Sequence, residues 1–179
     1  MPSDTEALRS AAATHAVYGI PIDGTTLLRT GSMYGPRAVR DASSRLVSYH
    51  TDHDLDLSDH LDLVDCGDVE VVPGNAARTF ANARADLAAI YAADVMPIVL
   101  GGEHSVTIPA AAALADATPH GRLGLVNFDS HFDTSVDVLG ERLTHCSPIT
   151  RALETGRYRP QNTVLLGIHG CGNPRAEHE

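Results

Sequence analysis

The chain has 179 residues, a length typical of one globular domain. Hydrophobic residues make up 43% and charged residues 20%, which excludes an intrinsically disordered chain, and no apolar run is long enough for a transmembrane helix. The balance of 13 basic against 23 acidic residues gives a net charge of -10, which argues against nucleic acid as a partner because an acidic surface repels phosphate.

Strands and helices are predicted to alternate along the chain. The first 14 residues are polar and then alanine-rich, which indicates a tail or a frayed helix ahead of a single α/β domain over 15–179. Short apolar runs predict strands over 15–20, 61–65, 96–100, 123–128 and 163–168. Apolar spacing and proline at a first helical position predict helices over 35–46, 75–93, 106–117 and 148–154. This order predicts a parallel sheet with helices on its faces.

Residue types that bind metal ions follow two of the predicted strands. The strand over 96–100 runs into the sequence GGEHS, which contains His104, and the strand over 123–128 runs into DSHFD. In an extended segment, a spacing of two places Asp129, His131 and Asp133 on one face, and His104 would be a fourth ligand. Mixed oxygen and nitrogen donors favour Mn, Fe, Co or Zn. The alternative interpretation of DSHFD alone is a solvated acidic loop.

Two other groups of polar residues are interpreted differently. The acidic segment 52–56 and the histidines around it are expected to form a solvated loop. Cys146 follows His145, but adjacent side chains on an extended chain point to opposite faces, which argues against a nucleophilic pair.

The three cysteines are widely spaced and the N-terminal sequence lacks a secretory signal, so we expect a cytoplasmic protein without disulfides.

These motifs resemble those of the ureohydrolases, the arginase and agmatinase family. GGEHS at 101–105 resembles the family's GGDHS motif, NFDSHFD at 127–133 resembles DAHxD, and the segment 19–40 resembles an agmatinase-type opening. The resemblance implies a three-layer α/β fold of the arginase/deacetylase type, with a parallel sheet between helices. It also implies a binuclear Mn²⁺ site in which His104, Asp129 and Asp133 bind one ion and His131 the other, with Asp129 bridging.

The resemblance further implies an agmatinase-like reaction. A hydroxide that bridges the two ions attacks the guanidinium carbon of a small guanidino substrate, releasing urea and an amine, and His145 shuttles protons. Family membership implies a homo-oligomer, and neither nucleic acid nor a membrane is an expected partner. Two alternatives stay open: an inactive ureohydrolase remnant that binds at most one ion, and another metal-dependent amidohydrolase or deacetylase on the same fold.

The sequence departs from the family pattern, most clearly at the third metal motif. The third metal motif, of the form S-x-D-x-D-x-x-D-P, is absent, so the second metal site is expected to be incomplete. We therefore expect a chain truncated at its C-terminus, with an incomplete sheet and a patternless segment after Ile168. Glu103 also replaces the aspartate of GGDHS, and the additional methylene is expected to shift a hydrogen bond near the site.

Overall fold

The computed structural model describes residues 5–120 and 122–178. The strands are β1 (His15–Ile20), β2 (Tyr49–His50), β3 (Leu55–Asp56), β4 (Leu63–Asp68), β5 (Met96–Gly101), β6 (Leu123–Phe128) and β7 (Tyr158–Leu166). The α-helices are α1 (Thr5–Ser10), α2 (Gly35–Ser43), α3 (Ala76–Ala92), α4 (Thr107–Ala117), α5 (Pro148–Glu154) and α6 (Arg175–His178). Short 3-10 helices are η1 (Ser32–Tyr34), η2 (Thr51–His53), η3 (Leu57–Asp59) and η4 (His104–Val106).

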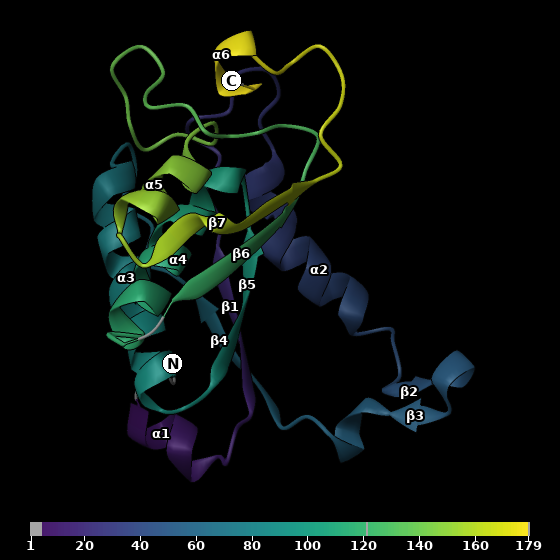
Figure 1. The fold of residues 1–179 in the computed structure, drawn as a ribbon. Helices are drawn as coiled ribbons and strands as arrows, with labels where there is room; N and C mark the ends of the chain where they lie inside the picture. The colour runs from purple at the N-terminus through teal and green to yellow at the C-terminus, as the bar shows by residue number, and fades with distance from the viewer. Residues whose placement is uncertain (1–4, 121, 179) are drawn as a thin grey trace.

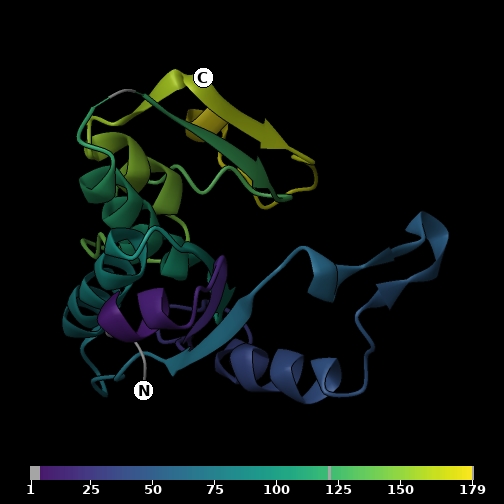
Figure 2. The same cartoon turned by 90° about the horizontal axis from the view of Figure 1, so that it is seen from below.

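The predicted α/β class is confirmed, and five of the strands form two parallel sheets, while β2 and β3 form a short antiparallel pair. One sheet has the order β4-β1-β5 and the other pairs β6 with β7, with every neighbour parallel. Figure 1 labels the strands, and Figure 2 shows the β6–β7 pair set apart from the three-stranded sheet. The expected single sheet is therefore divided between β5 and β6, whose facing edges share no ladder of hydrogen bonds.

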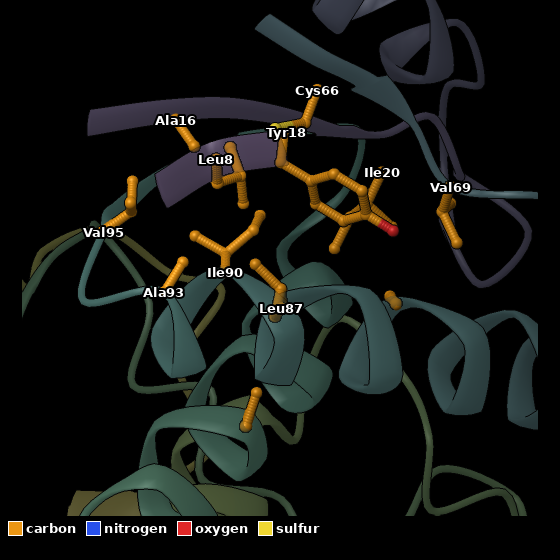
Figure 3. Packing of buried hydrophobic residues seen from close by; sticks show 12 residues of the cluster. Leu8, Ala16, Tyr18, Ile20, Cys66, Val69, Leu87, Ile90, Ala93 and Val95 are labelled. Carbon is orange, nitrogen blue, oxygen red and sulfur yellow. The ribbon is translucent and has the colours of Figure 1, made fainter. Parts of the chain in front are cut away.

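Helices cover both faces of the three-stranded sheet. On one face, Tyr18 and Ile20 of β1 pack against Leu87 and Ile90 of α3 (Figure 3). Gly19 points to the opposite face because side chains alternate along a strand. A β-carbon at Gly19 would lie 3.1 Å from Pro36 of α2, so α2 covers that second face. This arrangement gives the three layers that the fold class predicts.

A second, smaller core joins α4 and α5 to the β6–β7 pair. Its buried members are Ala111, Ala115, Ala152 and Tyr158. The Tyr158 hydroxyl donates to the Ala111 carbonyl oxygen over 3.2 Å, and burial raises the pKa of Tyr158 to about 12. This core fixes the first half of β6, through Leu123 and Leu125, close to α4, which follows β5 after the short helix η4.

Four segments differ in detail from the predicted elements. The segment expected as a tail or frayed helix contains α1, whose Leu8 is buried in the main core, while residues 1–4 lie outside the described residues. The acidic segment 52–56 lies in the loop that carries the short β2–β3 hairpin, and residues 52–54 are exposed. Strand β7 begins five residues before the predicted 163, at Tyr158. The chain after Ile168 contains the one-turn helix α6.

Within the described residues, no helix is both long and apolar enough to cross a bilayer. All three cysteines lie in this part of the chain, and none forms a disulfide.

Candidate metal centre

The end of β5 approaches the loop that follows β1, and this contact positions His104. A β-carbon on Gly102 would overlap the carbonyl oxygen of Ile22, so only glycine permits the approach. The Glu103 amide donates to the same Ile22 oxygen over 2.9 Å. His104 then begins η4 at the carboxyl end of the strand, where ligands of parallel α/β sheets are bound.

The end of β6 brings two carboxylates to the same place. The Asp129 amide donates to the Leu166 carbonyl oxygen of β7 over 3.0 Å, so the sheet holds this residue in place. Asp133 adopts a left-handed backbone conformation with φ of 51°, and its carbonyl oxygen accepts from the Ile149 amide of α5. Aspartate tolerates this conformation better than most residues, and the turn directs a largely buried carboxylate toward His104.

Three of the four predicted ligands are brought together. His104 Nδ1 lies 2.5 Å from Asp133 Oδ2 and 3.4 Å from Asp129 Oδ2. One ligand atom from each residue lies within 4.8 Å of the others. One nitrogen and two carboxylate oxygens at this spacing fit a divalent ion that accepts mixed donors. The metal-ligand roles themselves stay predictions.

His131 lies beside this cluster, not in it. Its side chain is about half exposed, and its Nδ1 atom is 3.6 Å from Asp129 Oδ1. The segment from Asp129 to Asp133 is bent, so the expected extended strand with three side chains on one face is not formed. Asp129 nevertheless turns one oxygen toward His104 and the other toward His131, which is the position of a carboxylate able to bridge two ions.

His145 lies in a turn before α5 and faces the same cavity. Its amide donates to Thr25 Oγ1 over 2.9 Å, and its Nδ1 atom lies 3.3 Å from that hydroxyl. The cavity has a volume of about 730 Å³ and is also lined by His104, Asp129 and Asp133. The predicted proton-shuttle residue and the predicted ligands therefore share one open space.

Cys146 lies closer to His145 than the sequence argument allowed. Its Sγ atom is 3.3 Å from His145 Nε2, because the two residues occupy a turn and not an extended chain. The expectation of opposite faces is thus wrong. Burial, with the nearby charge of Asp133, raises the pKa of the Cys146 thiol. A thiol that resists ionisation is a poor nucleophile, so the geometry does not make this pair a catalytic dyad.

Sequence reasoning missed the contribution of the segment after Ile168. The Asn173 side chain accepts from the Phe132 amide over 3.0 Å and donates to the Ser130 carbonyl oxygen over 2.9 Å. Glu177 accepts from the amide and hydroxyl of Thr134 and from the Ser135 hydroxyl. Both residues pack against the bend that carries Asp129 and Asp133. No periodicity marks this segment, so the sequence held no signal for these contacts.

Comparison with known proteins supports this fold. A profile of the Arginase family matches residues 13–179. The chain belongs to the arginase family. Among its relatives, the guanidinopropionase of Pseudomonas aeruginosa is 35% identical over 161 residues, which cover 89% of this chain and 50% of that protein. The agmatinase of Bacillus subtilis is 36% identical over 152 residues, which cover 85% of this chain and 51% of that protein.

Solved structures of the arginase family give the same result for the fold. The proclavaminate amidino hydrolase of Streptomyces clavuligerus superimposes with a TM-score of 0.82 at 29% identity, covering 91% of this chain and 53% of that one. The agmatine ureohydrolase of Thermoplasma volcanium superimposes with a TM-score of 0.81 at 30% identity, covering 94% and 54%. This arginase-family chain spans about half the length of the relatives it matches.

Proposed function

We propose that this chain carries the site of an agmatinase-like ureohydrolase, which uses Mn²⁺ to hydrolyse a small guanidino compound to urea and an amine. The observation that carries the proposal is the meeting of His104, Asp129 and Asp133 at the carboxyl ends of two strands. Membership of the arginase family supports the reaction class. The names of the relatives, a guanidinopropionase and an agmatinase among them, support a guanidino substrate without selecting one.

In this proposal, His104, Asp129 and Asp133 hold one ion, and His131 with Asp129 holds part of a second site. A divalent ion held there would supply Lewis-acid chemistry and lower the pKa of water. The mixed nitrogen and oxygen donor set suits manganese better than a soft metal ion. The paired orientation of Asp129 toward His104 and His131 supports the binuclear arrangement.

The remaining roles fall to residues of the same cavity. His145 lines it and would accept a proton from the reacting centre and return one to the leaving amine. Glu177 also lines the cavity and adds a negative charge that favours a cationic guanidinium group. The overall charge of -10 acts in the same direction and supports an agmatine-like substrate over an anionic one. The proposal also includes a cytoplasmic location and assembly into a homo-oligomer.

Metal binding tests the cluster directly. Titration of the purified chain with Mn²⁺, followed by calorimetry or by the loss of the free-ion EPR signal, should report binding that requires the three clustered side chains. Asp133→Asn should weaken Mn²⁺ binding at least about tenfold because it replaces a charged ligand oxygen with a neutral amide. Asp52→Asn makes the same chemical change in an exposed loop and should leave binding unchanged. Equal binding by both variants would contradict the assignment.

A urea assay on the Mn²⁺-loaded chain tests the reaction. Agmatine, guanidinobutyrate, guanidinopropionate and arginine form the substrate panel, and release of urea from at least one of them is the expected result. One bound ion with no urea from any substrate would reject activity for this chain and favour the inactive remnant. Turnover of an acetylated amine in place of the panel would reveal a deacetylase.

A further inference from the structure

Glu103 lies at the centre of a buried hydrogen-bond network beside the candidate metal centre. Its Oε1 atom accepts from the hydroxyls of Thr25 and Ser105, each over 2.6 Å. Its Oε2 atom accepts from the Thr25 amide and the Thr26 hydroxyl, each over 3.0 Å. The residue is only 7% exposed, so these four donors replace the water that its carboxylate would otherwise bind.

The Thr25 hydroxyl connects this carboxylate to His145. Its oxygen has three polar neighbours: Glu103 Oε1 at 2.6 Å, the His145 amide nitrogen at 2.9 Å and His145 Nδ1 at 3.3 Å. A hydroxyl has one proton to donate and two lone pairs with which to accept. A glutamate carboxylate accepts only, and a backbone amide donates only. The single Thr25 proton therefore points to Glu103, and the hydroxyl accepts from the His145 amide.

This assignment leaves one role for the third neighbour. With its proton given to Glu103, the Thr25 oxygen can only accept from His145 Nδ1, so Nδ1 carries the hydrogen. We infer that Glu103 and Thr25 are positioning residues that hold neutral His145 in the Nδ1–H tautomer and leave the lone pair on Nε2. Glu103 does not touch the imidazole and acts on it only through the hydroxyl of Thr25.

The surroundings of Nε2 agree with this tautomer. The Cys146 Sγ atom lies 3.3 Å from Nε2, and burial keeps this thiol protonated by raising its pKa. A protonated thiol is a weak donor, so it can donate to a lone pair on Nε2, which is compatible with the Nδ1–H tautomer. The two ends of the ring thus have complementary neighbours: an acceptor at Nδ1 and a donor at Nε2.

The consequence for catalysis rests on the proposed function. If His145 moves protons in the cavity, the tautomer presets Nε2 as the atom that accepts the first one. The Glu103 carboxylate would then fix the tautomer in the way a carboxylate orients a catalytic histidine, but through an intervening hydroxyl. Glu103, the residue that departs from the GGDHS motif, would thus control the tautomer of His145.

NMR of the imidazole ring nitrogens tests the inference without metal or substrate. In ¹⁵N-labelled protein at a pH where the ring is neutral, long-range ¹H–¹⁵N correlations distinguish the two tautomers, and His145→Gln assigns the signal. The wild-type chain should show the Nδ1–H form. Because the tautomer is read independently of turnover, a silent urea assay would reject the proposed function and leave this measurement intact.

Glu103→Gln gives the sharpest expected change. The Thr25 amide can only donate, so the glutamine oxygen must occupy the Oε2 position and its NH₂ group the Oε1 position. That NH₂ group then donates to Thr25 Oγ1, which frees the hydroxyl proton to point at His145 Nδ1. The variant should therefore switch His145 to the Nε2–H tautomer.

Three further variants separate this effect from general disruption. Thr25→Ser keeps the hydroxyl and should keep the Nδ1–H form, whereas Thr25→Val removes it and should leave a mixture of tautomers. Ser105→Ala removes a different donor from Glu103 Oε1 and should keep the Nδ1–H form. Amide shift dispersion in the same spectra checks that each variant is folded. An Nε2–H signal in the wild-type chain, or an unchanged Nδ1–H signal in folded Glu103→Gln, would overturn the inference.

Discussion

Arg40 links α2 to β4 through two carboxylates. Its Nε and Nη2 atoms donate to the two oxygens of Asp65 over 2.7 and 2.9 Å, and its Nη1 atom donates to Asp68 over 2.6 Å. The hydrogen bond from Arg40, together with its charge, holds the pKa of Asp65 below the ordinary value. The same hydrogen bond raises the pKa of Arg40, which stays charged at any pH of interest.

This ion pair predicts a defined acid sensitivity. The pKa of Asp65 is lower in the folded state than in the unfolded state. The ionised Asp65 side chain therefore stabilises the fold at pH values above about 3.9, the ordinary aspartate pKa. This contribution is lost as the pH falls through the pKa of Asp65 in the folded state. About half of the Asp65 side chain is exposed, so we expect at most about 1 kcal/mol. Urea unfolding of Asp65→Asn across acidic pH should show a shallower loss of stability than the wild-type chain.

Asp52→Asn is the matched control, because Asp52 lies in an exposed loop. It should retain the acid dependence of the wild-type chain. Identical pH profiles for the wild-type and Asp65→Asn proteins would show that the contact with Arg40 does not contribute.

At the level of single residues, the sequence predicted positions better than orientations. His104, Asp129 and Asp133 follow strands with recognisable motifs, and strand ends of a parallel sheet meet at one edge. The direction of His131 and the proximity of Cys146 to His145 depend on bends that the sequence does not mark. The contact between Glu103 and Thr25 joins residues 78 positions apart, so no local pattern reveals it.

The segment after β7 acts as a support for the bend that holds the candidate ligands. Asn173 and Glu177 contribute side-chain hydrogen bonds to the backbone or hydroxyls of residues 130–135. A bend with few bonds of its own needs such support to hold two carboxylates in a fixed geometry.

Asn173→Ala should loosen this bend. The variant removes the acceptor of the Phe132 amide, which should lower the free energy of local opening by ~1 kcal/mol. That change corresponds to about fivefold faster exchange of the Phe132 amide with solvent. Hydrogen–deuterium exchange followed by NMR measures this rate. Asn82→Ala removes a comparable bond, from Asn82 to the Glu70 carbonyl oxygen, and should leave Phe132 unaffected. Equal exchange rates in the wild-type chain and Asn173→Ala would refute the supporting role.

Element order was predictable, whereas element limits and sheet continuity were not. Clear apolar periodicity located α3 to within a residue at each end. Strand β7 begins earlier than predicted. Residues 159–161 are exposed and consist of two polar residues and a proline, so the first part of the strand has no apolar pattern. The order of elements along the chain does not determine which strands pair. The break in the sheet between β5 and β6 therefore could not be predicted from that order.

The division of the sheet leaves an apolar surface uncovered on the β6–β7 pair. Val126 lies opposite Val164 and Phe128 opposite Leu166 in the parallel register. All four side chains are exposed, Phe128 to 81%. The other face of the pair packs on α4 and α5, so helices cover only one side here. A paired apolar row of this kind on a strand face is typical of a protein–protein contact.

We expect this surface to drive association of two or more copies of the chain. Sedimentation velocity should show a mass that rises with protein concentration. In the double variant Val126→Glu with Val164→Lys, opposite charges face each other across the strands, which preserves the net charge and the pairing while making the surface polar. The dissociation constant of the association should increase at least about tenfold, because each side chain buries less apolar area on contact.

Leu46→Glu supplies the control for this experiment. Leu46 is also an exposed apolar residue, but it lies after α2 and away from the β6–β7 pair, so its replacement should leave the association unchanged. A wild-type chain that stays monomeric at every concentration would exclude the apolar row as a contact surface. An equal effect of both variants would count against the β6–β7 surface as the contact, because a charged residue far from it would then weaken the association to the same degree.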